Sequence, residues 1–323
     1  MAVIAALGIG GTHFQYAAGT PEGELLTETW TEPTEARRLE QQVTDAIVRL
    51  QAECNEDLFA VAVASKGLVD PKTGTIELLA INGGDTIENV ELGRVVEDRF
   101  DLPLYLENDC TAAVLAEYHF GDVQADSVVH ITIGTGIGAG VIDRGEIVRG
   151  ESNFAGEVGG IRVGPMDGLE WCGIPGAWEA YCSGPGICHY VKDRLRTEAR
   201  ESRLRDVDAD ALDTPIIFEM ADRGDRVANE YLEEISRFNA AAIATVSNLY
   251  NPGLITLGGG VALNNEARII SGITRHLDDY LVVEPPLIEA TEIDMLGIYG
   301  ALARVHHKTA APPASISQQR VSR

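Results

Sequence analysis

Three glycine-rich segments, each directly after an apolar stretch, are the residues of this sequence best suited to hold a phosphate. They occupy residues 8–12, 134–140 and 258–260. A glycine turn at the end of a strand exposes backbone N–H groups and lets an anion approach the chain closely. Any one of the three could be an ordinary turn, but together they favour a ligand that carries phosphate groups.

The middle segment, GTGIGAG, also fits a dinucleotide-binding fingerprint through Gly134, Gly136 and Ala139. That fingerprint requires a helix directly after the turn, because the pyrophosphate binds at the helix N-terminus. The residues that follow, VIDRGEIVRG, instead predict a hairpin with its turn at residues 143–145. A nicotinamide-dependent enzyme is therefore disfavoured.

A second candidate for chemistry is the segment LENDCTAAVLAEY at residues 106–118. Here Asn108 and Asp109 stand where a short apolar strand is expected to meet an alanine-rich helix. The helix dipole favours an ionised carboxylate at that point, and α/β proteins place ligands at strand ends. Asn and Asp are also favoured helix caps, so the segment by itself leaves a catalytic carboxylate and an ordinary cap both open.

Strands and helices that alternate along the chain must position these motifs. Apolar runs predict strands at residues 3–7, 14–18, 59–64, 104–106, 128–133 and 254–257, and helical spacing predicts helices at 34–54, 90–100, within 223–251, at 264–280 and at 296–306. This alternation indicates an α/β protein. The order strand, glycine turn, strand occurs near residue 3 and again near residue 128, which indicates a weak internal repeat.

The composition limits the classes of partner. The chain has 323 residues, enough for two domains, and a formal net charge of −25, which argues against a phosphate-neutralising nucleic-acid surface. Of its 25 basic residues only four are lysine (Lys66, Lys72, Lys192 and Lys308). An acid-rich, lysine-poor chain is typical of a halophile, because molar salt screens the repulsion among its charges.

The cysteines and the apolar segments point to the cytoplasm. Five scattered cysteines do not suggest a disulfide framework. The apolar start MAVIAALGIGG has no basic residue and is interrupted by glycines, so it predicts a first strand and not a signal peptide. No apolar run is long enough to span a membrane. The tail at residues 308–323 has no core pattern and is expected to be disordered.

In this order of motifs the chain resembles the ROK family of sugar kinases and repressors. The matching segments are GIGGT at 8–12, LENDCTAA at 106–113, IGTGIGAG at 133–140, AGEVGG at 155–160, GLEWCGIPGAWEAYCSG at 168–184, NPGLITLGGGV at 251–261 and LGIYGALA at 296–303. The resemblance covers roughly residues 1–307. It implies an actin-like, duplicated ribonuclease-H-like fold, with ATP and sugar between a small lobe (residues 1–109 and 296–307) and a large lobe (110–295).

The resemblance also implies roles for individual residues. Asp109 matches the catalytic base, and Asn108, Glu157 and Glu179 match ligands of sugar hydroxyls, with Gly67 and Asn82 near the sugar loop. The residues implied to bind ATP are Gly10, Gly11, Thr12, Gly134, Thr135, Gly136, Gly138, Gly258, Gly259 and Gly260. The implied cofactors are ATP and Mg²⁺, and the implied assembly is a homodimer.

Two departures from the family pattern concern metals. An aspartate usually leads the first phosphate loop and helps to hold Mg²⁺, whereas this chain has Gly8. The family's zinc-binding histidine is replaced by Gly160, and two of the three cysteines of its zinc signature are replaced by Glu170 and Ala177. A tetrahedral zinc site needs four good ligands, so we expect no zinc.

A replacement zinc site built from Cys172, Cys182, Cys188 and His189 stays open as an alternative, although small buried cysteines are more common. Two functions also stay open. The first is an active ATP-dependent sugar kinase, and the second is a sugar-binding or regulatory protein with weak or no catalysis. ROK repressors carry a helix-turn-helix before the phosphate loop, and this acidic chain begins at the loop, so DNA binding is not expected. The sequence does not identify the sugar.

Overall fold

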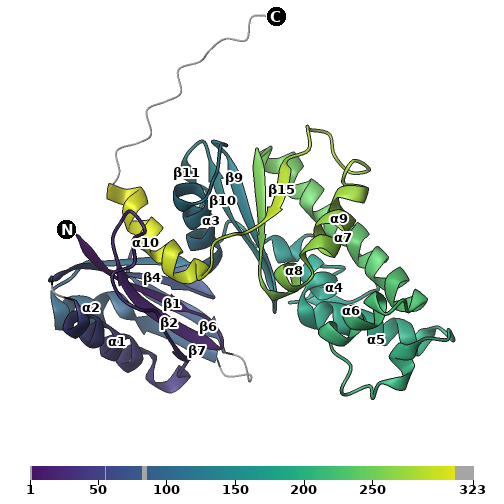
Figure 1. Ribbon diagram of the computed structural model, residues 1–323, viewed down its shortest axis with the longest axis horizontal. Coiled ribbons are helices and arrows are strands. Elements are labelled where there is room, and N and C mark those ends of the chain that lie inside the picture. Colours follow the sequence, from purple (N-terminus) through teal and green to yellow (C-terminus); the bar gives the residue numbers. More distant parts are fainter. Residues whose placement is uncertain (1, 55, 82–85, 310–323) are drawn as a thin grey trace, which may run out of the picture. The chain divides into compact units, whose positions relative to one another are not determined.

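The computed structural model describes residues 2–54, 56–81 and 86–309 (Figure 1). Asn82 and most of the expected disordered tail therefore lie outside the described residues. The chain forms two compact units, one of Met1–Phe120, Ile142–Ile147 and Met295–Arg323, the other of Gly121–Val141 and Val148–Asp294. The first unit thus extends past the boundary at residue 109 that the family resemblance implies.

The main sheet of the first unit has the strand order β3-β2-β1-β4-β8. These strands are β1 (Val3–Ile9), β2 (His13–Gly19), β3 (Trp30–Pro33), β4 (Leu58–Ser65) and β8 (Leu104–Asn108). The strand β1 pairs antiparallel with β2 and parallel with β4, and β4 pairs parallel with β8. The carboxyl ends of β1, β4 and β8 therefore lie at one edge of the sheet, where the first glycine turn and Asp109 begin.

The other five-stranded sheet, whose strands β9, β14 and β15 belong to the second unit, repeats this order as β11-β10-β9-β14-β15. Its strands are β9 (Val128–Ile133), β10 (Ile137–Asp143), β11 (Glu146–Ile147), β14 (Leu254–Gly258) and β15 (Leu287–Ala290). As in the first sheet, β14 pairs parallel with both of its neighbours, β9 and β15. In chain order both sheets read third, second, first, fourth, fifth strand, so the internal repeat predicted from the sequence is confirmed.

Alternating side chains of β1 pack against two separate layers of the first unit. Val3, Ala5, Leu7 and Ile9 join the core that contains α1 (Leu39–Glu53) and α2 (Leu92–Phe100). The intervening Ile4 and Ala6 join the core that contains α10 (Leu296–Thr309). Because strand side chains alternate between faces, Gly8 lies on the α10 side.

The helix α3 (Asp109–Phe120) belongs to the first unit because it packs directly on α10. Ala112 and Ala301 lie in their shared core. At Gly300 a Cβ atom would lie 2.6 Å from the backbone of Ala112, so only glycine permits this approach. The helix α10 also continues to Thr309, past its expected end at residue 306, which shortens the expected tail.

A small sheet of order β5-β6-β7 completes the first unit. Its strands are β5 (Leu68–Asp70), β6 (Thr75–Ala80) and β7 (Thr86–Glu91), and a short 3₁₀ turn η1 (Ala36–Arg38) precedes α1. The helix expected from residue 90 begins only at Leu92, because Val90 and Glu91 pair with β6. The backbone pairing with β6 holds these two residues in a strand, although the local sequence pattern predicts a helix.

Helices surround the sheet of the second unit. They are η2 (Val158–Gly160), α4 (Trp178–Cys182), α5 (Gly184–Thr197), η3 (Arg203–Asp206), α6 (Thr214–Asp222), α7 (Arg226–Tyr250), α8 (Gly260–Asn264) and α9 (Glu266–Leu277), with a hairpin of β12 (Glu170–Trp171) and β13 (Ile174–Pro175). The buried Trp178 donates a hydrogen bond of 2.7 Å to Asn239 and ties α4 to α7. Within the described residues, no helix combines the length and the apolar character that crossing a membrane requires.

Candidate active site

The first glycine turn, residues 10–12, joins β1 to β2 and is held on both sides. The Gly10 N–H donates to the His13 carbonyl at 2.9 Å, which closes the turn. Thr34, directly after β3, also anchors the turn, because its hydroxyl donates to the Gly10 carbonyl at 2.8 Å and its N–H donates to the Thr12 carbonyl at 3.0 Å. The three residues predicted to bind phosphate here thus form one ordered turn.

Gly8, where the family has an aspartate, lies in a close backbone contact. A Cβ atom at Gly8 would lie 3.3 Å from Cα of Gly297 in the first turn of α10, and a Cβ atom at Gly297 would lie 3.3 Å from Cα of Gly8. Two glycines therefore let the start of α10 approach the end of β1. The loss of the aspartate is accompanied by this contact, so an added side chain requires a small shift of α10.

Asn108 ends β8 and provides the cap of α3. Its Oδ1 accepts hydrogen bonds from the N–H groups of Cys110 at 2.9 Å and Thr111 at 3.3 Å. Its Nδ2 donates to the Gly67 carbonyl at 3.1 Å, so the structure brings these two predicted sugar-site residues together. Asn108 is therefore the cap, and Asp109, the candidate catalytic carboxylate, is the first residue of the helix.

Asp109 is partly buried, and burial raises the pKa of its carboxyl above the ordinary value of 3.8. Two effects oppose this rise in pKa: the hydrogen bond from the Cys110 N–H and the positive charge of Lys66. A carboxylate with a raised pKa is a stronger proton acceptor than an exposed one while it stays ionised. This environment suits a general base.

Lys66 is a site residue that the sequence motifs do not identify. It follows β4, whose last residue, Ser65, pairs with Asn108, and its N–H donates to the Ile9 carbonyl at 2.8 Å. It therefore sits between the ends of β1 and β8, where its charge acts on Asp109. One feature of the sequence could have indicated Lys66: it is one of only four lysines, and it directly follows an apolar strand.

The second glycine turn is shorter than predicted. It comprises residues 134–136, closed by a 3.0 Å hydrogen bond from the Gly134 N–H to the Gly136 carbonyl. The strand β10 begins at Ile137, so Gly138 lies in a strand and not in the expected turn of residues 134–140. Backbone pairing in the sheet extends into the glycine-rich sequence because glycine tolerates extended conformations as well as turns.

The third glycine run lies against the second turn. A Cβ atom at Gly134 would lie 3.6 Å from the Gly260 nitrogen. Gly258 ends β14 in register with Thr132, and Gly259 has φ +86° and ψ 153°, a conformation that only glycine adopts readily. The two turns predicted to bind ATP in this unit therefore form one continuous backbone surface.

Glu179 supports the second turn from the start of α4. Its Oε2 accepts a 2.7 Å hydrogen bond from the Ile137 N–H, and a Cβ atom at Gly136 would lie 3.0 Å from the same oxygen. Glu157 is exposed and follows Gly156, whose carbonyl accepts a hydrogen bond of 2.9 Å from the Ala139 N–H. Both predicted sugar ligands of this unit thus lie on segments that are fixed to β10.

The region of the family's zinc signature forms the hairpin β12–β13. Its turn is Cys172 and Gly173, with φ of 48° and 77°, and Cys172 is exposed. A Cβ atom at Gly160 would lie 3.3 Å from Cδ1 of Ile174, so an apolar contact occupies the histidine's position. Cys182 is buried in the core, and this burial raises its thiol pKa well above the ordinary value.

We expect purified protein to contain no stoichiometric zinc. Across the described ranges no three His, Cys, Asp or Glu side chains gather as metal ligands would, and the Cys188 thiol donates to the Leu212 carbonyl at 3.0 Å. Elemental analysis after dialysis checks this directly. About one zinc ion per chain would contradict it and would point back to the four-residue alternative site around Cys172.

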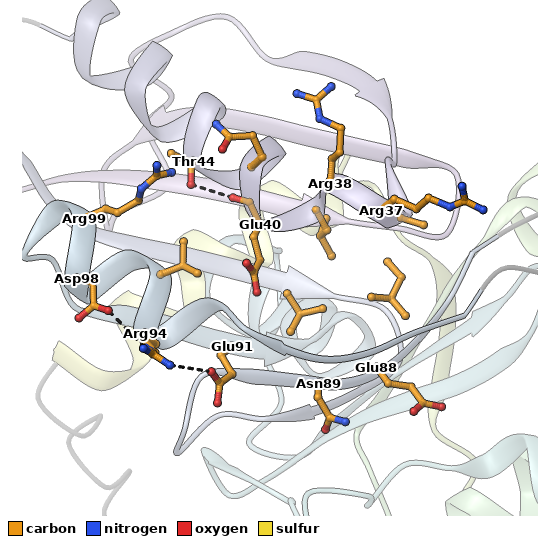
Figure 2. A pocket seen from close by; sticks show the side chains of 16 residues that line it. Arg37, Arg38, Glu40, Thr44, Glu88, Asn89, Glu91, Arg94, Asp98 and Arg99 are labelled. Carbon is orange, nitrogen blue, oxygen red and sulfur yellow. Dashed lines mark hydrogen bonds and ion pairs between the residues drawn. The ribbon is translucent and has the colours of Figure 1, made fainter.

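A pocket of about 710 Å³ opens on the first unit among residues of α1, β7 and α2 (Figure 2). Arg94 forms ion pairs there with Glu91 at 3.6 Å and Asp98 at 3.5 Å. These pairs are exposed, so they contribute little to the stability of the fold. Neither Asp109 nor a glycine turn lines this pocket, and we do not place the active site there.

The duplicated strand order, with glycine turns at the strand ends, defines an actin-like ATPase fold. The chain belongs to the ROK family, whose model matches residues 4–308. A glucokinase of Halalkalibacterium halodurans is 31% identical and covers 84% of each chain. The crystal structure of a ROK family glucokinase from Streptomyces griseus, in complex with glucose and AMPPNP, is 29% identical, covers 94% of this chain and 97% of that one, and has a TM-score of 0.73.

Relatives of another class are also present. A putative xylose repressor of Caldicellulosiruptor is 27% identical over 67% of this chain and 54% of that protein. Family membership therefore establishes the fold and relatedness to glucokinases, while the activity of this chain has to be argued from its own residues.

Proposed function

We propose that this protein is an ATP-dependent sugar kinase. The observation that carries the proposal is the position of Asp109 at the start of α3, beside the Asn108–Gly67 hydrogen bond and within the electrostatic influence of Lys66. The similarity to glucokinases supports it. In the reaction Asp109 accepts the proton of a sugar hydroxyl while that oxygen bonds to the γ-phosphorus of ATP and the bond to the β-phosphate oxygen breaks, releasing ADP.

The remaining residues have positioning roles, because phosphoryl transfer depends mainly on alignment and charge neutralisation. In our proposal Asn108, Glu157 and Glu179 bind sugar hydroxyls. Glu179 also holds the Ile137 N–H with one oxygen, so it fixes the second glycine turn at the same time. The three glycine turns bind ATP through their backbone N–H groups. Asn82, predicted near the sugar, lies outside the described residues.

The substrate is taken to be MgATP, with Mg²⁺ brought by the nucleotide. Gly8 offers it no ligand, and a side chain at this position would require a small shift of α10, because its Cβ would lie 3.3 Å from Cα of Gly297. The charge of Lys66, at the end of the neighbouring strand, is suited to neutralise part of the developing phosphate charge. We therefore propose a kinase whose own residues bind Mg²⁺ more weakly than those of family members that have the aspartate.

The alternative is a sugar-binding or regulatory protein with weak or no catalysis. The glycine at position 8 favours it, because glycine offers no ligand to Mg²⁺, and a putative xylose repressor is among the relatives of this chain. The intact group around Asp109 favours the kinase. The two functions differ in turnover, so kinetics separates them.

Replacing Gly8 with aspartate is expected to raise kcat while leaving the affinity for sugar nearly unchanged. The new carboxylate would act on Mg²⁺ in the transition state, and such an interaction changes kcat rather than substrate binding. Because its Cβ would lie 3.3 Å from Gly297, we also expect a modest fall in Tm. Steady-state kinetics of both proteins at saturating sugar and varied Mg²⁺ measures the effect.

The outcomes of this comparison are distinct. A rise in kcat supports a slow kinase, whereas an inert wild type that Gly8→Asp fails to rescue supports the binding protein. A fast wild type that the substitution slows would indicate that another group serves as the Mg²⁺ ligand and that the new side chain overfills the site. Ala6→Ser, on the same face of β1, is the control for a general effect of adding a polar group to this strand.

The proposed function itself is tested by ADP release coupled to a panel of sugars. The panel contains glucose, fructose, mannose, N-acetylated hexosamines and ketodeoxy sugar acids, each with MgATP. Assays in molar KCl are appropriate because the net charge of −25 requires screening in the proposed halophilic protein. Sugar-dependent ADP release with one panel member supports the kinase, and equal ADP release with and without every sugar argues against it.

A further inference from the structure

One face of α10 contacts the neighbourhood of both the first glycine turn and Asp109. Gly297, Gly300 and Arg304 are spaced by three and four residues, so they share one side of the helix. Gly297 contacts the backbone of Gly8, and Gly300 contacts that of Ala112 in α3. Arg304, the third residue on this face, has a charged side chain that is mostly buried in the first unit.

That charge forms a buried ion pair. Nε of Arg304 lies 3.1 Å from Oε2 of Glu107, and the exposed fractions of the two side chains are 14% and 2%. Both charges have therefore lost most of their hydration, and their mutual attraction compensates that loss only in a well-defined geometry. A buried ion pair is weak evidence for stability, since apolar residues often serve equally well. Its placement, however, is informative.

Glu107 connects this pair to the residues of the proposed site. Its Oε1 accepts a 3.2 Å hydrogen bond from the N–H of Asn108. Asn108 in turn holds Gly67 and the first N–H groups of α3, including that of Cys110. The Cys110 N–H also donates to Oδ1 of Asp109 at 3.0 Å. A continuous series of polar contacts thus leads from Arg304 on α10 to the carboxylate of Asp109.

We infer that Arg304 is a positioning residue of the phosphoryl-transfer site. By holding Glu107, it fixes the Asn108 cap and the first turn of α3, and so determines where the Asp109 carboxylate lies relative to the end of β1. The inference rests on the proposed function for its kinetic consequence, but not for the local order that it predicts. It assigns to α10 a role beyond packing.

The test uses a double variant in the full-length protein, Arg304→Met with Glu107→Gln. Removing both charges avoids the uncompensated buried charge that either single substitution would leave. We expect this variant to fold, and to lower kcat roughly 10- to 100-fold because the base is displaced. The KM for MgATP should change by less than about twofold, since the glycine turns are untouched.

Lys308→Met is the matched control. It removes one positive charge from the same helix, but Lys308 is exposed and stacks on Tyr105 at 5.4 Å instead of contacting Glu107. Its kcat should equal that of wild type. Arg304→Lys keeps the charge and most of the reach, and should retain more activity than the double variant. A purely structural role would lower stability without separating kcat from KM.

Hydrogen exchange of the amides at the β8–α3 junction tests the positioning independently of turnover. We expect about tenfold faster exchange at Asn108, Cys110 and Thr111 in the double variant than in Lys308→Met. Wild-type exchange there, or a folded double variant with wild-type kcat, would overturn the inference. An inert wild type combined with faster exchange in the double variant would refute the proposed kinase activity and leave the positioning role standing.

Discussion

Replacing Asp109 with asparagine should lower kcat by at least ~10²-fold, the range usual when a general acid or base is removed. Asparagine keeps the size of the side chain but cannot accept the hydroxyl proton. Asn108 still caps α3, so the fold should survive and the sugar should still bind. Steady-state kinetics and sugar titration by calorimetry measure the two effects, and near wild-type turnover would exclude Asp109 as the base.

The pH dependence of the wild type provides an independent check on the role of Asp109, because it reports the protonation of that carboxyl. Because burial raises the pKa of its carboxyl above 3.8, kcat/KM of the wild type should begin to fall on acidification at a higher pH than an exposed aspartate would give. The ionised carboxyl also makes the folded state less stable above its raised pKa, and this penalty disappears as the pH falls to the unfolded value. At neutral pH the Asp109→Asn protein should therefore melt no lower than wild type.

Replacing Gly259 with alanine should destabilise the second unit by about 2–6 kcal/mol. The backbone conformation of Gly259, φ +86° and ψ 153°, costs any other residue about 1–3 kcal/mol. The new Cβ would also lie 2.5 Å from the Ile133 carbonyl oxygen, and such overpacking costs about 1–3 kcal/mol more. Thermal melting followed by circular dichroism should show a Tm lower by about 4–24 °C, because 1 kcal/mol lowers the Tm of a unit of this size by about 2–4 °C.

Gly260→Ala is the matched control one residue further on. A Cβ there would lie 3.7 Å from Nδ2 of Asn264, an ordinary contact, so its Tm should equal that of wild type. If ATP approaches this backbone closely, as we propose, Gly260→Ala should nevertheless raise the KM for ATP. An unchanged Tm in Gly259→Ala would contradict the structural argument, and an unchanged KM in Gly260→Ala would contradict the nucleotide assignment.

Much of the fold could be predicted because the buried strands are strongly apolar. The strands β1, β4, β9 and β14 are almost entirely buried, and the helix α7 has a long apolar face. Short elements were missed for physical reasons, since β12 and β13 have two residues each and exist only through their pairing. The helices α5 and α6 could have been predicted from their N-caps, Ser183 and Asp213, because a proline follows each cap in the first turn of the helix.

The site could be predicted only where short motifs carry it. Asn108 and Asp109 adjoin one another in sequence, so one segment indicates both. Arg304 and Glu107 are far apart along the chain, and nothing local at either position indicates their pairing. The turn at Gly138 was predicted wrongly because sheet pairing, which starts at Ile137, is decided by the neighbouring strand and not by glycine content.

The central claim is the transfer of phosphate from ATP to a sugar at Asp109. The most direct test incubates the wild type and Asp109→Asn with MgATP labelled at the γ-phosphate, in molar KCl, with and without the sugar that gives the fastest ADP release. We predict that label appears in a sugar phosphate with the wild type and at least ~10²-fold more slowly with Asp109→Asn. Label found only in inorganic phosphate, or equal transfer by both proteins, would contradict the claim.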